Sequence, residues 1–132
     1  GPVFVHFTWL HIVFNTMWWW QLGGTIEREL GKGALINLLL TSAIISNVAQ
    51  FLVSGPNFGG LSGVVYALFG YCWILGKYKP KLGVTIQPTV FGIALIWLVA
   101  GYFDVFGISV ANTAHLLGLI VGCSLGWIET KR

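Results

Sequence analysis

Long apolar runs occupy most of this 132-residue sequence and constrain its fold more than any other feature. Each run has about the ~20 residues that an α-helix needs to cross ~30 Å of hydrocarbon. No strand-like alternation of apolar and polar residues persists through them. The runs cover roughly residues 7–26, 34–53, 58–76, 82–103 and 108–128. The sequence therefore predicts an all-α fold, a polytopic transmembrane bundle of five helices. Pro88 is expected to shorten the fourth helix to about 89–103, because proline fits only the first turn of a helix.

The composition argues against several other classes of protein. Only 8% of the residues are charged and 56% are hydrophobic, whereas a soluble domain carries about 25% charged residues. A soluble enzyme and a disordered segment are both disfavoured. Seven basic residues are too few to track a nucleic-acid backbone, and two cysteines without a Cys/His cluster indicate neither a disulfide framework nor a zinc site. We expect no nucleic-acid partner, no metal and no cofactor.

The charged residues predict how the helices are oriented. All of them except Asp104 lie in three short segments that follow the first, third and fifth runs: Glu27, Arg28, Glu29 and Lys32; Lys77, Lys79 and Lys81; Glu129, Lys131 and Arg132. Helices that alternate in direction bring these segments to one end of the bundle. The positive-inside rule makes that end cytoplasmic. The first helix then begins on the extracytoplasmic side, so we expect the chain to lack at least one upstream transmembrane helix.

Polar residues inside a membrane are costly and are therefore candidates for function. His6, His11, His115 and Ser62 all fall toward the expected extracytoplasmic ends of their helices. His11 and Asn15 are four residues apart and so share one helix face. A zinc site is disfavoured because His6 and His11 point in different directions.

A second group of polar residues forms a stripe on the second run. Ser42, Ser46 and Gln50 repeat every four residues, with Asn47 beside them. We favour hydrogen bonds between helices as the role of this stripe, and a water-filled cavity remains the alternative.

Small residues indicate which helices approach each other most closely. They repeat every four residues in the third run (Gly59, Gly63 and Ala67) and in the fifth run (Ala114, Gly118, Gly122 and Gly126). Such ridges let two helix backbones pack closely in a membrane. The two runs point the same way, so packing of the ridges would bring Ser62 and His115 together.

A serine beside a histidine is the minimum set for nucleophilic catalysis, because the imidazole accepts the hydroxyl proton. His11 and Asn15 are candidate donors to an oxyanion, together with the Ser62 N–H group. Tyr66 lies one turn after Ser62 and is expected to pack on the His115 ring. A structural Ser–His hydrogen bond and ordinary aromatic packing of Tyr66 remain open at this point.

Two motifs extend these observations. Gly60-Leu61-Ser62-Gly63 resembles the G-x-S-G motif of the rhomboid intramembrane serine proteases. Ala114-His115, followed by Gly118 and Gly122, is similar to the A-H-x-x-G-x-x-x-G motif of the same family. The resemblance covers nearly the whole chain and is closest to the bacterial members.

Two further segments carry the same resemblance near the start of the chain. His6, His11 and Asn15 are similar to the histidine-rich first helix of the family, H-x4-H-x3-N. Glu27-Arg28, after Gly23-Gly24, resembles the family's G-x-x-x-E-[RK] helix end.

The resemblance implies a six-helix fold, of which residues 1–132 would hold helices two to six without the first helix and first loop. It implies a catalytic dyad of Ser62 and His115, supported by Gly60 and Gly63, with Tyr66 packed on the histidine. It further implies oxyanion donors at His11 and Asn15, and a loop over residues 104–110 that caps the site with Phe106. The implied setting is the bacterial inner membrane, with the site open to the extracytoplasmic side.

The function implied is that of an intramembrane serine endopeptidase, whose partners are transmembrane protein substrates and the lipid bilayer. A rhomboid-like pseudoprotease that binds membrane clients without cleaving them is the alternative, although Ser62 and His115 are both present. A transporter or channel is less favoured because the sequence shows no inverted repeat. Cys72 and Cys123 are expected to be inert core thiols. Trp18, Trp19 and Trp20 are expected to anchor the first helix at the membrane interface and to contact lipid.

Overall fold

The computed structural model describes residues 2–54, 61–102 and 112–132, and the side chains at positions 13, 16–48, 51–52, 63–96 and 115–132. The described residues form five α-helices and contain no strand, so the predicted all-α class is confirmed. The helices are α1 (Pro2–Leu30), α2 (Lys32–Ser54), α3 (Leu61–Tyr78), α4 (Pro88–Tyr102) and α5 (Asn112–Thr130), with a 3-10 helix η1 (Pro80–Leu82) between α3 and α4. Helix α4 begins at Pro88, as the restricted backbone of proline predicts.

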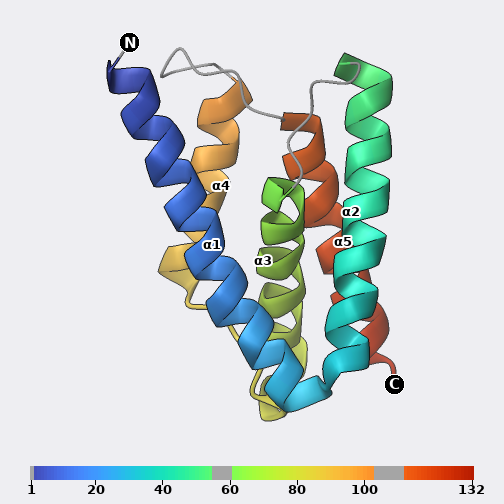
Figure 1. Cartoon of the computed structure of the whole chain (residues 1–132). Helices are drawn as coiled ribbons and strands as arrows, with labels where there is room; N and C mark the ends of the chain where they lie inside the picture. Colours follow the sequence, from blue (N-terminus) through green and yellow to red (C-terminus); the bar gives the residue numbers. More distant parts are fainter. Residues whose placement is uncertain (1, 55–60, 103–111) are drawn as a thin grey trace.

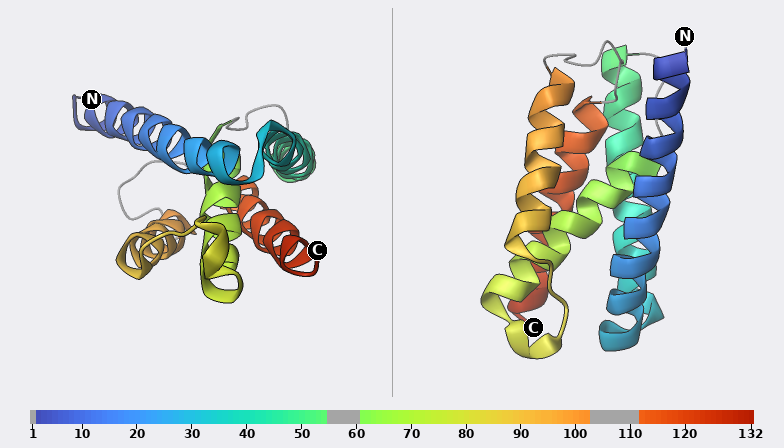
Figure 2. Two further views of the ribbon diagram at one scale, coloured as in Figure 1. Left: turned by 90° about the horizontal axis from the view of Figure 1, so that it is seen from below. Right: turned by 90° about the vertical axis from the view of Figure 1, so that its left-hand side faces the viewer.

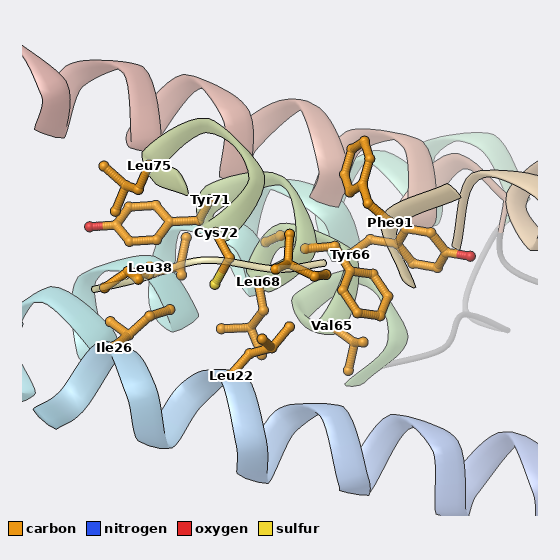
Figure 3. Packing of buried hydrophobic residues seen from close by; sticks show 14 of the residues in the cluster. Leu22, Ile26, Leu38, Val65, Tyr66, Leu68, Tyr71, Cys72, Leu75 and Phe91 are labelled. Carbon is orange, nitrogen blue, oxygen red and sulfur yellow. The ribbon is translucent and has the colours of Figure 1, made fainter. Parts of the chain in front are cut away.

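Helix α3 is the centre of the bundle. Viewed along the bundle axis, it is surrounded by α1, α2, α4 and α5 (Figure 2). Every residue from 63 to 72 is buried, which explains why this helix is apolar on all sides. Leu22 and Ile26 of α1 and Leu38 of α2 pack on one side of this central helix (Figure 3). The core is therefore built around α3 rather than between paired helices.

The charged segments lie together at one end of the bundle, the end that also holds the C-terminus (Figure 1). Two tight connections produce this arrangement. Gly31, between α1 and α2, has a φ of 94°, and Gly83, between η1 and α4, has a φ of 78°. Both values lie in the left-handed region that glycine adopts without steric cost. The described helices thus run in the alternating directions that the charge pattern predicts.

Membrane crossing is the sequence prediction for all five helices. Within the described parts of the chain, no helix is both long enough and apolar enough to cross a membrane. The five crossings stay a prediction.

Helix α4 is attached to the central helix through aromatic packing. Phe91 stacks on Trp73 of α3, with ring centroids 4.5 Å apart and an interplanar angle of 4°. Phe91 is 9% exposed, so this contact belongs to the core (Figure 3). It fixes the half of α4 that lies nearer the charged end.

The serines of the polar stripe do not bond as the sequence suggests. Ser42 Oγ donates to the Leu38 carbonyl at 2.7 Å, and Ser46 Oγ donates to the Ser42 carbonyl. Both acceptors are four residues earlier in α2, where a serine hydroxyl reaches the carbonyl of the preceding turn. The prediction of hydrogen bonds between helices was therefore wrong for these two residues. The side chain of Gln50 lies outside the described residues.

The three consecutive tryptophans differ in their surroundings. Trp18 and Trp19 pack partly against the core, whereas Trp20 is 76% exposed. Trp18 meets the ring of Phe69 edge-on at a centroid distance of 5.8 Å. The face of α1 that carries Trp18 is thus turned toward α3, whereas Trp20 lies on the outer surface. Interface anchoring and lipid contact stay a prediction for these residues.

Candidate active site

Helices α3 and α5 pack with their backbones in contact. A Cβ atom at Gly118 would overlap the carbonyl oxygen of Gly63, and one at Gly122 would overlap the carbonyl oxygen of Ala67. A Cβ atom at Gly126 would lie 3.1 Å from the Tyr71 carbonyl oxygen. The contact points advance by four residues in both helices, so the two helices run parallel. Glycine is needed at Gly118 and Gly122 because any side chain there would force the helices apart, and Gly126 leaves little room for one.

This packing buries His115, in the first turn of α5, between the two helices. His115 lies three residues before Gly118 on α5, and therefore on the face that meets α3. Its side chain is only 1% exposed. The imidazole stacks on the ring of Tyr66, with centroids 4.8 Å apart and an interplanar angle of 25°. The orientation of the imidazole plane is thus restricted by an aromatic ring from the neighbouring helix.

Tyr66 is itself held from two other directions. Its hydroxyl donates a hydrogen bond to the Ala94 carbonyl of α4 at 3.0 Å. The rings of Tyr66 and Phe69 are perpendicular, with a centroid distance of 5.6 Å and an angle of 90°. Phe69 in turn contacts Trp18 of α1. A continuous series of rings therefore connects α1, through α3, to the histidine on α5.

The structure does not describe the side chains of the remaining predicted site residues. Ser62 belongs to α3 and immediately precedes Gly63, but its side chain lies outside the described residues. The same is true of the side chains of His11 and Asn15, which belong to α1. Gly60 and Phe106 are outside the described residues altogether. The structure therefore brings Tyr66 and His115 together, and does not describe the other side chains.

No group of three metal-ligating side chains occurs among the residues that the structure describes. Cys72 and Cys123 are both free thiols, Cys72 being fully buried. Among the described contacts, none joins either thiol to His115.

Two parts of the site were missed by sequence reasoning. The contact of Phe69 with Tyr66 could have been predicted from the sequence, because the two residues are three apart and so share a helix face. The role of the Ala94 carbonyl could not, because a backbone acceptor is present at every position of a sequence.

These features define an all-α bundle in which two parallel, glycine-packed helices hold a buried histidine against a tyrosine. The chain belongs to the rhomboid family, since the Rhomboid domain model matches residues 1–132. It is similar to proteins named Rhomboid protease GlpG from Salmonella choleraesuis, Salmonella newport and Salmonella heidelberg, each 51% identical over 128 residues. The match covers 97% of this chain and 46% of each relative, so the chain spans about half of their length.

Proposed function

We propose that residues 1–132 form the core of an intramembrane serine endopeptidase, which hydrolyses peptide bonds in or near transmembrane segments of other proteins. The observation that carries this proposal is the buried stack of His115 on Tyr66, beside the contact of Gly63 with Gly118. The name of the relatives, Rhomboid protease, supports the same activity.

The spacing of residues on α3 supports Ser62 as the nucleophile. Ser62 and Tyr66 are four residues apart on one helix, so they share a face. The ring of Tyr66 contacts His115, and the residue after Ser62 is the one whose carbonyl faces Gly118. A serine on this face of α3, one turn before Tyr66, belongs at the same level of the bundle as the histidine.

The chemistry then follows the usual course of acyl transfer. The Ser62 hydroxyl attacks the substrate carbonyl while its proton moves to His115, and that proton then passes to the departing amine. Water hydrolyses the resulting ester with His115 again accepting a proton, which restores the serine. His11 and Asn15 would donate hydrogen bonds to the oxyanion. No metal or cofactor takes part in this scheme.

The outer surface supports a bilayer setting. Large apolar side chains are exposed on the outside of α2 and α4, including Ile44 at 61%, Leu52 at 78% and Ile96 at 70%. The basic segments gather at one end (Figure 1), which favours that end as cytoplasmic in the inner membrane. The catalytic residues would then open to the extracytoplasmic side, beneath a loop over residues 104–110 that carries Phe106.

The substrate in this proposal is a transmembrane helix that unwinds locally. A helix engages its carbonyl groups in its own hydrogen bonds, and a serine cannot attack them until those bonds break. Residues that weaken a helix should therefore favour cleavage.

The test is cleavage of a single-span membrane protein by the full-length enzyme in liposomes. Ser62→Ala and His115→Ala should each abolish cleavage, and the double variant should be no worse, because the two residues act as one unit. Ser46→Ala is the matched control, since the Ser46 hydroxyl bonds within its own helix. Cleavage that persists in Ser62→Ala contradicts the proposal. Wild-type protein that binds the substrate without cutting it indicates a pseudoprotease instead.

A further inference from the structure

An aromatic pair joins the charged ends of α3 and α5. The rings of Tyr78 and Trp127 meet edge-on, with centroids 5.3 Å apart and an interplanar angle of 84°. Both are large rings at the protein surface, Tyr78 being 49% exposed and Trp127 46% exposed. An exposed pair of this kind, one ring from each helix, contributes little to the core.

Each ring of the pair has a lysine over it. Lys131 Nζ lies 4.3 Å from the centroid of Trp127, and Lys77 Nζ lies 5.6 Å from the centroid of Tyr78. Both distances are within the range of a cation–π interaction. The rings therefore hold two exposed ammonium groups at the junction of the two helices, and we call these four residues the α3–α5 aromatic–lysine cluster.

The local charge favours an anion at this cluster. The nearby carboxylate of Glu129, in the last turn of α5, is paired with Arg132 just beyond the helix end at 3.4 Å. An anion that approaches the cluster thus meets the ammonium groups of Lys77 and Lys131 and a carboxylate that already has a partner.

An apolar surface leads away from the cluster along α5. Leu116, Ile120 and Trp127 are exposed by 38%, 49% and 46%, and their spacing of four and seven residues puts them on one helix face. The ligand that matches both parts is amphipathic: a negative head at the lysines and hydrocarbon along this face.

We propose that the α3–α5 aromatic–lysine cluster binds the phosphate of an anionic phospholipid, whose acyl chains lie along the exposed face of α5. This inference rests on the membrane setting of the proposed function, but not on the protease chemistry. Lysines near a membrane surface attract anionic lipid with a free energy that corresponds to about fivefold in affinity for each lysine. Aromatic rings at that level position the lysine side chains, since they prefer the interface of a bilayer.

The test is a titration of the detergent-purified, full-length protein with phosphatidylglycerol, read as bound lipid by native mass spectrometry. Phosphatidylcholine of the same chain length is the neutral comparison. We expect phosphatidylglycerol to bind more tightly, and Lys77→Gln/Lys131→Gln to weaken its binding by roughly twentyfold. The control is Lys32→Gln/Lys81→Gln, which removes two charges from the same end of the bundle but leaves the aromatic pair untouched. It should change the affinity by less than about threefold.

Two further arms make the result decisive. Trp127→Leu keeps an apolar residue but removes the ring beneath Lys131, and it should weaken phosphatidylglycerol binding by about fivefold. Glycerol phosphate at millimolar concentration should not displace the lipid. Equal binding of the two lipids, equal losses in the two lysine pairs, or full displacement by glycerol phosphate would each overturn the proposal. Because no proteolysis is measured, this failure is distinguishable from failure of the proposed function.

Discussion

The hydroxyl of Tyr66 donates a hydrogen bond to the backbone carbonyl of Ala94 at 3.0 Å. The ring of the same side chain stacks on the imidazole of His115, with centroids 4.8 Å apart. One residue of α3 therefore contacts both α4 and the histidine of α5. The position of α4 and the orientation of the imidazole depend on the same side chain.

Tyr66→Phe should reduce cleavage while leaving the ring stack in place. The change removes the donor to Ala94 but keeps the aromatic face against His115. Loss of a net hydrogen bond lowers the free energy of unfolding by about 1 kcal/mol. We expect kcat to fall by about fivefold to tenfold with KM nearly unchanged, because the defect lies in positioning His115, the base in the proposed mechanism.

The control for this variant is Tyr78→Phe, which deletes the hydroxyl of an exposed tyrosine at the other end of α3. It should leave both kcat and thermal stability as they are. A Tyr66→Phe enzyme with wild-type kcat would show that the link to α4 has no part in positioning His115.

Phe91→Leu should separate the stability of α4 from catalysis. The substitution removes the parallel stack on Trp73, an interaction worth about 1 kcal/mol beyond the area it buries. Thermal unfolding in detergent should occur at lower temperature, whereas kcat should fall less than in Tyr66→Phe. Ile93→Leu, at a position that is 58% exposed, should change neither quantity. A larger loss of kcat in Phe91→Leu than in Tyr66→Phe would contradict this separation.

Replacing glycine by alanine should change the stability of the protein in opposite directions, depending on whether the glycine packs between α3 and α5 or faces open space. Gly118→Ala and Gly122→Ala each place a methyl group on the backbone carbonyl of α3, and should lower the free energy of unfolding by about 2 kcal/mol or more. Gly92→Ala adds the same methyl group in α4, where no described atom outside the adjoining turns of α4 lies within 4 Å of it. There the higher helix propensity of alanine should stabilise the protein by up to about 1 kcal/mol. Thermal denaturation of the three variants measures both signs, and equal stabilities would contradict the packing.

Much of the fold is visible in the sequence for physical reasons. The lengths of the apolar runs predict the five helices, and Pro88 predicts the start of α4 because its fixed φ suits a first helical turn. The repeat of small residues predicts that α3 and α5 approach most closely, which the contacts of Gly118 and Gly122 bear out. These features are local or periodic, so a single sequence carries them.

Other features depend on which face of each helix meets its neighbours in the folded bundle. Trp18 and Trp20 are only two residues apart, yet one contacts Phe69 and the other is 76% exposed. The hydroxyl of Ser42 bonds to the Leu38 and Leu39 carbonyls of its own helix rather than to a neighbouring helix. The hydrogen bond from Tyr66 to α4 ends on a backbone atom. None of these outcomes follows from residue type or spacing.

The most direct measurement of the central claim is covalent labelling of the full-length protein with a fluorophosphonate, followed by mass spectrometry of the modified peptide. Ser62 should be labelled, because the proposed mechanism gives its hydroxyl a base at His115 and oxyanion donors at His11 and Asn15. Ser42 and Ser46 bond to backbone carbonyls of their own helix and should stay unmodified. Labelling should vanish in His115→Ala and survive in Ser46→Ala. An unlabelled Ser62 in folded protein, or labelling that is unaffected by His115→Ala, would contradict the Ser62–His115 dyad.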